Sequence, residues 1–362
     1  MKLLRKMLEK ARPVFEKNSK LGIFRPIYEA MDNFFFAPST KTLAAPYVRD
    51  PLDIKRLMSM VIIALVPSLF AAFYFFGWRM VAMIMVSYMA GGAVEVAFAM
   101  IRKEEIYEGF LVTGMIFPLI LPPTLPLWMV ALGVAFGVFV GKELFGGTGR
   151  NIFNAAIVGR CFLALAYPAK MSSSWMTPGS GVTGRMFEYV GSSSVDAVSQ
   201  ATPLVLAKQG QLTELSDMFL GNISGSLAET SAIAIIIGGV FLLFTRVANW
   251  RTVVSILGSA GLLAAILHYN DSVRFAPAVW HLCAGGLLFG AFFMATDPVT
   301  SPASNGGKIA YGIVIGVTTM LIRNFTGYVE GVTFAILLGN IMAPIFDEIA
   351  FKVRLESLKN EG

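Results

Sequence analysis

A short polar stretch in this chain holds residues that could carry a covalently attached group. Asp196, Ser199, Ala201 and Thr202 occur together in SVDAVSQATPLV, residues 194–205. A threonine hydroxyl held by its neighbours is one way in which a protein attaches a cofactor. The same residue types also favour Asx and Ser/Thr turns. Because loop turns are common and covalent cofactor sites are rare, the residue types alone favour a turn.

The elements that must position this stretch are membrane helices. Of the 362 residues, 56% are hydrophobic and only 14% are charged, and the mean hydropathy is +0.67. A water-soluble domain of this size does not need such a composition. A helix that crosses a bilayer needs about 20 mostly apolar residues, and apolar segments recur along the chain at that scale. The composition therefore predicts an all-α integral membrane protein.

The apolar segments give about ten candidate transmembrane helices. They are residues 57–78, 80–101, 110–121, 127–144, 152–167, 231–244, 252–267, 279–295, 309–322 and 332–346. These helices divide the chain into a basic N-terminal segment (1–56), a first membrane repeat of five helices (57–167), a polar loop (168–230), a second repeat (231–347) and a tail (348–362).

The distribution of charge predicts the orientation in the membrane. Residues 1–56 hold twelve Lys or Arg against six Asp or Glu. By the positive-inside rule, this segment is cytoplasmic, and ten crossings return the C-terminus to the same side. The polar loop, residues 168–230, is then extracytoplasmic. The excess of positive charge indicates topology and contact with lipid headgroups, and it does not indicate nucleic-acid binding. Residues 3–11 have the helical spacing of a segment that lies on the membrane or docks on a partner.

The two halves contain an internal repeat. GMIFPLILPPTLP from Gly114 and GAFFMATDPVTSP from Gly290 share two glycine or phenylalanine positions and three proline or threonine positions. With five crossings in each half, equivalent segments enter from opposite faces, as in an inverted repeat. Both copies are short and end in proline-rich turns. We expect short or broken third and eighth helices that meet inside the membrane, although simple helix ends at proline explain the same pattern.

Other reactive residue types do not form a recognisable site. Cys161 and Cys283 are too few for an iron-sulfur cluster held by this chain alone. His268 and His281 have no metal-ligand spacing. The glycine-rich segment FGGTGRN, residues 145–151, could hold a phosphate, but it lacks the spacing of a dinucleotide-binding motif, so a connection between two helices is the simpler interpretation.

Several stretches together carry a resemblance to a known family. DAVSQATPL, EGFLVTGMIFPLILPPTLPLW, GKELFGGTGRNIFNAAIVGR, FFMATDPVTSPASNGGK and LLGNIMAPIFD resemble two homologous ten-helix proteins. These are the B subunit of the Na+-translocating NADH:quinone oxidoreductase (Nqr) and the D subunit of the Rnf complex. The resemblance extends from about Val48 to Asp347.

The resemblance implies a redox function and a cofactor site. In the family, a threonine carries FMN through a phosphoester bond, and a flavin transferase installs it outside the cytoplasm at an Asp-x-x-(Ser/Thr)-x-Ala-Thr pattern. Here the pattern corresponds to Asp196, Ser199, Ala201 and the acceptor Thr202. The resemblance also implies a non-covalent riboflavin near the cytoplasmic side. It further implies the other subunits of a six-subunit complex in a bacterial inner membrane, where electron transfer is coupled to movement of Na+ or H+.

The resemblance does not separate the two complexes cleanly. The basic N-terminus and VRDPLDIKRLM resemble the Nqr protein, and Gly91, Gly92 and Glu95 match a region that this protein uses near quinone. The very short turn after the first span and the segment SQATPL are closer to Rnf. We therefore expect the D subunit of Rnf slightly more than the B subunit of Nqr.

Further site residues are predicted inside or beside the spans. An ionised carboxylate within a membrane helix is costly, so Glu95 is a candidate for a quinone or ion path. Arg160 lies at a depth that makes it the expected internal partner of Glu95, unless it binds a phosphate. Asp297, Thr300 and Asn305 could form a polar floor for the second flavin, although a cap and an Asx turn explain them equally.

Two alternatives from other classes stay open. An inverted repeat with broken helices is also the design of a channel or secondary transporter, which needs no flavin. A scaffold that only holds partner subunits needs no cofactor.

Overall fold

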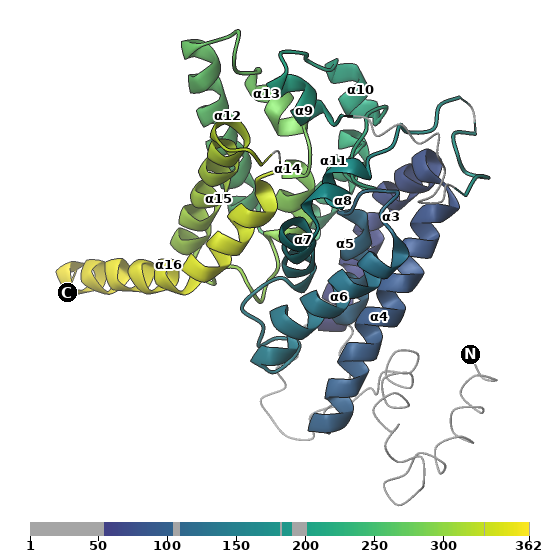
Figure 1. Ribbon diagram of the computed structural model, residues 1–362. Helices are drawn as coiled ribbons and strands as arrows, with labels where there is room; N and C mark the ends of the chain where they lie inside the picture. Colours follow the sequence, from purple (N-terminus) through teal and green to yellow (C-terminus); the bar gives the residue numbers. More distant parts are fainter. Residues whose placement is uncertain (1–53, 104–108, 182, 190–200, 329, 362) are drawn as a thin grey trace, which may run out of the picture.

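The computed structural model describes residues 54–103, 109–181, 183–189, 201–328 and 330–361 (Figure 1). Within these residues every regular element is a helix. The expectations for Asp196, for Ser199 and for the basic segment before residue 54 lie outside the described residues.

The helices follow one another with short connections. In chain order they are α3 (Ile54–Phe76), α4 (Trp78–Arg102), α5 (Gly109–Leu119), α6 (Leu127–Gly141), the 3-10 turn η3 (Glu143–Phe145), α7 (Ala155–Ala166), α8 (Pro168–Ser173), α9 (Pro203–Lys208), α10 (Leu215–Leu220), α11 (Ala232–Phe244), α12 (Trp250–Asn270), α13 (Ala278–Cys283), α14 (Leu287–Phe289), the π-helix η4 (Gly290–Met294), α15 (Asn305–Phe325) and α16 (Val332–Glu361).

Six of these helices are long and apolar enough to cross a membrane. They are α3, α4, α6 with η3, α12, α15 and α16. Three shorter apolar helices, α5, α7 and α11, have 11 to 13 residues. Large side chains such as Phe70, Met89 and Leu262 are about two-thirds exposed on the long helices. A surface of this kind is stable in lipid, so the protein is an integral membrane protein.

The predicted eighth span is not one helix. α13 ends at Cys283, and the chain turns at Gly285, where φ is +61°. Two short helical pieces, α14 and η4, complete the segment. The third span is a short single helix, because Pro122 and Pro123 follow α5 after two residues and cannot continue it.

Small residues allow the short helices to pack closely against long ones. Along one face of α6, Gly133, Gly137 and Gly141 recur every fourth residue and meet α7. A Cβ atom on Gly137 would lie 2.3 Å from the carbonyl oxygen of Ala155. In lipid, helices associate through such close van der Waals contacts and not through the hydrophobic effect.

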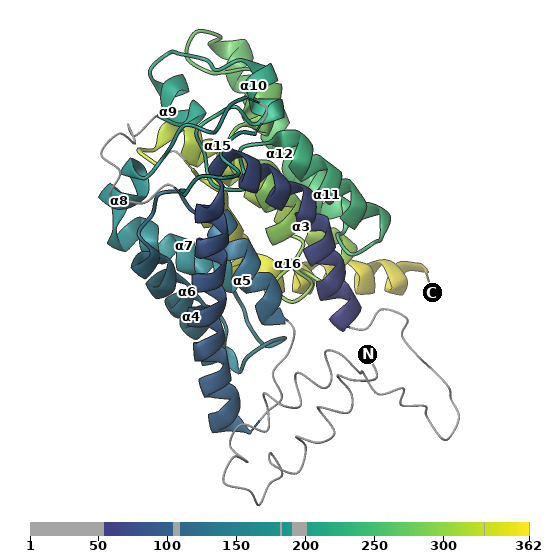
Figure 2. The same ribbon diagram turned by 90° about the vertical axis from the view of Figure 1, so that its right-hand side faces the viewer.

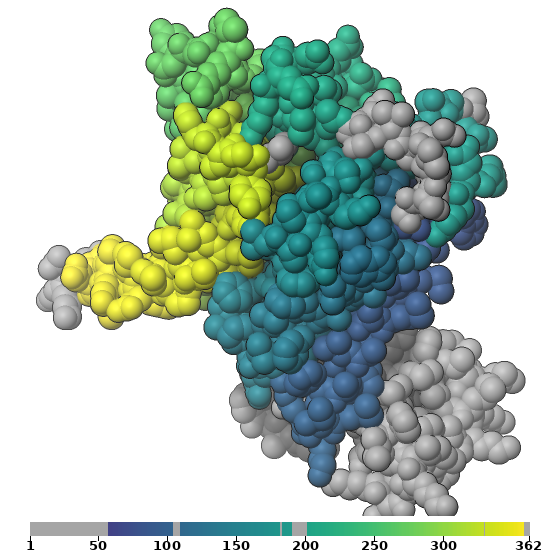
Figure 3. All heavy atoms as spheres, viewed as in Figure 1, coloured from purple at the N-terminus to yellow at the C-terminus, as the bar shows by residue number. Residues whose placement is uncertain are grey.

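The polar loop lies at one end of the molecule. In both views α8, α9 and α10 lie at the end where α3 turns into α4 (Figures 1 and 2). The hydrogen bond from Trp78 N to Glu188 O (3.1 Å) attaches the loop to that turn. The end of α16 extends sideways from the body (Figure 3). The predicted tail, 348–362, is therefore a continuation of the last helix through Glu361.

Candidate functional site

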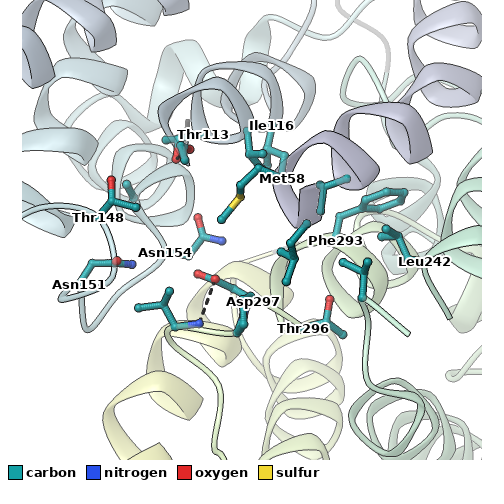
Figure 4. A pocket seen from close by; sticks show the side chains of 18 of the residues that line it. Met58, Thr113, Ile116, Thr148, Asn151, Asn154, Leu242, Phe293, Thr296 and Asp297 are labelled. Carbon is teal, nitrogen blue, oxygen red and sulfur yellow. Dashed lines mark hydrogen bonds between the residues drawn. The ribbon is translucent and has the colours of Figure 1, made fainter. Parts of the chain in front are cut away.

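A narrow inner cavity lies between the two halves of the chain, near the starts of α3 and α5 (Figure 4). Its volume is about 80 Å³. Polar and charged side chains in its wall are Thr113, Lys142, Thr148, Asn151, Asn154, Thr296 and Asp297. Apolar side chains from α3, α5, α11 and η4 complete the wall. The cavity therefore combines an apolar body with a few polar groups, which is typical of ligand sites.

Among the described residues, Asp297 is the acidic group that lines the inner cavity, and Figure 4 shows its carboxylate pointing inward. It accepts hydrogen bonds from Val299 N and Thr300 Oγ1, both at 3.2 Å. Burial raises the pKa of Asp297 above its usual value, although these two hydrogen bonds oppose the shift. Thr300 thus binds the Asp297 carboxylate but does not itself line the cavity. Asn305 is exposed at the start of α15 and is also outside the cavity wall.

The amides of the glycine-rich connection approach the same cavity. Asn154 is the N-cap of α7, and its Oδ1 accepts a hydrogen bond from Ala156 N at 3.0 Å. Asn151 Nδ2 donates to the carbonyl of Phe153 at 3.0 Å. Both side chains are therefore fixed by local backbone contacts and present amide groups to the cavity.

Glu95 has a different partner from the one expected. Its Oε1 lies 2.6 Å from Lys142 Nζ, and both side chains are about 5% exposed. Arg160 is not its partner, because α4 packs against α6, and Lys142 at the end of α6 is at the depth of Glu95. Gly91, one turn before Glu95, faces Val134 of α6, so the small residue permits this approach.

Removal of the lysine should expose the cost of a buried unpaired carboxylate. We expect Lys142→Met to destabilise the protein by about 3 kcal/mol, since a broken buried pair leaves one charge without compensation. The double variant with Glu95→Leu should recover at least half of this loss. Thermal unfolding in detergent measures both. If the double variant is no more stable than Lys142→Met, Glu95 is not the charge that Lys142 neutralises.

A larger outer cavity of about 420 Å³ lies at the end that carries the polar loop. Thr202 lines it, next to Pro203 and Leu204 of α9. Three aromatic side chains, Trp175, Tyr328 and Phe334, are also in its wall. Thr202 is the N-cap of α9, and its side chain accepts no capping hydrogen bond. The hydroxyl is therefore not committed to the helix start and is half-buried beside an open space.

The second half of the chain holds α9 in place. Lys208 Nζ, at the end of α9, donates to the carbonyls of Thr326 (2.8 Å) and Tyr328 (3.0 Å). At the other end, Leu204 packs on Gly285, where the broken eighth segment turns. Thr202 is thus positioned by residues more than 80 positions away in the sequence.

Arg160 lies in the wall of this outer cavity, not beside Glu95. Its guanidinium contacts Glu229 at 3.2 Å and Glu330 at 3.3 Å. The sequence pattern did not single out these two glutamates. Glu229 lies near the end of the polar loop, and Glu330 lies two residues before α16. Carboxylates at the edges of spans look like ordinary solvated residues until the fold buries them.

Comparisons with known proteins identify the family of this chain. The family described as NQR2, RnfD, RnfE matches residues 41–355. This chain belongs to that family. Three relatives, each named as the B subunit of the Na(+)-translocating NADH-quinone reductase, are 38% identical in Ectopseudomonas mendocina, 37% in Azotobacter vinelandii and 36% in Klebsiella pneumoniae subsp. pneumoniae. The alignments cover 98%, 98% and 99% of this chain and 98%, 98% and 100% of the relatives, respectively.

Within the NQR2, RnfD, RnfE family, the relatives favour the B subunit of Nqr over the D subunit of Rnf. The slight preference for Rnf is corrected by their names and by their full-length coverage. The alignments extend over 409 to 419 positions, so these relatives contain residues that the 362-residue chain lacks. Loop length varies readily among relatives that share a core.

Proposed function

We propose that this chain is the electron-transfer subunit of a Na+-translocating NADH:quinone reductase and that it carries FMN covalently on Thr202. The observation that carries the proposal is the Thr202 hydroxyl, which makes no capping hydrogen bond to α9, ends a flavin-attachment pattern and borders a 420 Å³ cavity. The names of the full-length relatives support the complex. Their names give no support to the transporter and scaffold alternatives.

The outer cavity fits a flavin by its size and its chemistry. Ligand sites usually have volumes of about 300–1,000 Å³ and are mainly apolar with a few polar groups. Trp175, Tyr328 and Phe334 offer aromatic surfaces for a flat ring, and Arg160 with its two carboxylate partners forms a polar part of the wall. When bound, FMN would supply one-electron transfer at the outer face. The chain's own task is to hold the attachment point rigidly, which Lys208 and Leu204 do.

The inner cavity is our candidate for the second flavin, riboflavin. Asp297, Asn151 and Asn154 suit the polar edge of a flavin ring. The volume of about 80 Å³ is below the usual range, so a flavin there requires apolar side chains such as Met58 to move.

Asp297 offers a direct test of the riboflavin site. We expect Asp297→Ala to lower riboflavin retention at least tenfold, because a hydrogen bond to a charged group contributes about 1.5–3 kcal/mol. Covalent flavin on Thr202 should not change. The measurement compares the amount of flavin that acid precipitation releases with the amount that stays bound to the precipitated protein. The exposed neighbour Asn305→Ala is the control, and equal losses in both variants would contradict the assignment.

The proposed architecture is five helices plus five in an inverted repeat, with both termini in the cytoplasm. In the first half α4 packs on α6 and α6 packs on α7. In the second half α12 packs on α15 and α15 packs on α16. This correspondence and the paired short segments, α5 and α14 with η4, support the repeat. The polar loop with Thr202 is then extracytoplasmic, where the flavin transferase and the other subunits of the complex meet it.

The experiment that tests the function is a mass measurement on the wild-type chain. The protein is produced with its flavin transferase and digested, and the peptide that contains Thr202 is sequenced by fragmentation. We expect the mass of FMN minus water on Thr202. An unmodified peptide, from cells in which the transferase modifies another substrate, would refute the proposal.

A further inference from the structure

Four charged side chains from distant parts of the chain meet beside the outer cavity, and Arg160, Glu229 and Glu330 line it. Arg160 of α7 bridges Glu229 and Glu330, at 3.2 and 3.3 Å. Arg323 of α15 lies 3.6 Å from the other oxygen of Glu330. The side chains of both arginines and of Glu229 are at most 5% exposed, and that of Glu330 is 20% exposed. We call these four residues the outer charge cluster.

The two arginines are fixed in position. Arg323 donates to the carbonyls of His281 (2.8 Å) and Ala284 (2.9 Å), in the broken eighth segment. Arg160 is held between the two carboxylates. Neither guanidinium can release its proton in a protein, so the cluster contains two permanent positive charges.

The carboxylates are held from the cavity side and from the backbone. Glu330 accepts a hydrogen bond from Gly286 N at 3.0 Å, and Ser226 donates its hydroxyl to Glu229. A Cβ atom on Gly286 would lie 2.2 Å from Glu229 Oε1, so the glycine lets the chain pass directly against the carboxylate. Both glutamates line the cavity that Thr202 borders.

Other titratable groups near the cluster are few among the described residues. Besides the four members, α7 contributes Cys161, α13 contributes His281, and α9 contributes Lys208, which is bound to two backbone carbonyls. The charge of the cluster is therefore set by the protonation of its two carboxylates.

The two carboxylates do not hold a proton equally well. Burial raises the pKa of Glu229 to about 7, and the neighbouring charge of Glu330 adds to the shift. Burial also acts on Glu330, but Arg160 and Arg323 outweigh it and hold the pKa of Glu330 below its usual value. Glu229 contacts one arginine and Glu330 contacts two, which is the geometric reason for the difference.

We propose that Glu229 is the proton acceptor that balances the charge of an electron placed in the outer cavity. This inference rests on the proposed flavin at Thr202. One electron enters from a one-electron donor, such as a reduced flavin of a partner protein or a chemical mediator. One proton from the outer aqueous phase forms an O–H bond on the Glu229 carboxylate. The net charge of the cavity is then unchanged, and electron and proton leave together on reoxidation.

Coupling between reduction of the flavin and protonation of Glu229 predicts the pH range in which the midpoint potential changes. As the pH falls below about 7, Glu229 becomes protonated in the oxidised protein, so reduction binds progressively less additional proton. Above pH 7 it is ionised in the oxidised protein, and reduction makes protonation more favourable. The midpoint potential of the covalent flavin should therefore fall more steeply above pH 7 than the flavin's own protonation explains.

The test is a redox titration of the intact complex between pH 6 and 9 with one-electron mediators. In wild type, Glu229 should make the midpoint potential fall by up to about 59 mV more per pH unit above pH 7. One pH unit is a tenfold change in proton concentration, and a tenfold change corresponds to about 59 mV for a one-electron couple. Glu229→Gln should remove this added slope. The matched control Glu214→Gln, an exposed carboxylate of the same polar loop, should keep it. Equal slopes in wild type and Glu229→Gln would overturn the proposal.

An infrared measurement on wild type keeps the test independent of any variant's folding. Reduction above pH 7 should produce the band of a protonated carboxylic acid, and this band should shift in heavy water. Absence of the band in a complex with full covalent flavin would also overturn the proposal. Absence of covalent flavin on Thr202 would refute the proposed function instead, so the two failures are distinguishable.

Discussion

Thr202→Ala should leave the protein without flavin after denaturation, whereas wild type should keep its flavin fluorescence on a denaturing gel. The alanine has no oxygen for the ester, so the loss should be complete. The fold should change little. The Thr202 side chain makes no capping hydrogen bond in α9, and so the usual cost of about 1 kcal/mol for a lost N-cap should be reduced.

Two further variants make this result specific. Thr202→Ser keeps a hydroxyl on the same carbon and should retain measurable covalent flavin. Ser172→Ala removes a hydroxyl from α8 that lines the same cavity, and it should retain flavin at the wild-type level. Fluorescence that survives in Thr202→Ala would show that the flavin is attached elsewhere. An equal loss in Ser172→Ala would show that cavity shape, not the attachment atom, controls the signal.

Arg160→Met should be among the most destabilising single substitutions in the chain. It removes a buried cation and leaves Glu229 and Glu330 facing each other, with only Arg323 to compensate. Breaking a buried ion pair from one side costs about 3–5 kcal/mol, and here two partners lose the same cation. The thermal midpoint in detergent should fall by roughly 4–7 °C for a chain of this size.

The pH dependence of this loss identifies its cause. Uncompensated carboxylates can be neutralised by protons, so acidification from pH 8 to pH 5.5 should recover part of the lost stability of Arg160→Met. Lys170→Met, which removes an exposed cation from α8, should change stability by less than about 0.5 kcal/mol. A loss in Arg160→Met that is independent of pH would indicate lost packing in place of unpaired charge.

Hydropathy and turn chemistry determined much of this protein. The bounds of α3, α4 and α6 differ from the predicted spans by a few residues. The short third helix follows from its prolines, and the eighth segment is interrupted at Gly285, where φ is +61°. These features are local, because a bilayer requires about 20 apolar residues per helix and because glycine and proline act on their own backbone.

Only the tertiary structure decided which charges meet. Depth along a span made Arg160 the expected partner of Glu95, but depth does not state which way a helix faces. The packing of α4 on α6 pairs Glu95 with Lys142. The meeting of α7 with the loops before α11 and before α16 pairs Arg160 with Glu229 and Glu330. The rotation of each helix about its own axis is set by contacts with neighbours distant in the chain, and so the charge pairing is a property of the assembled bundle.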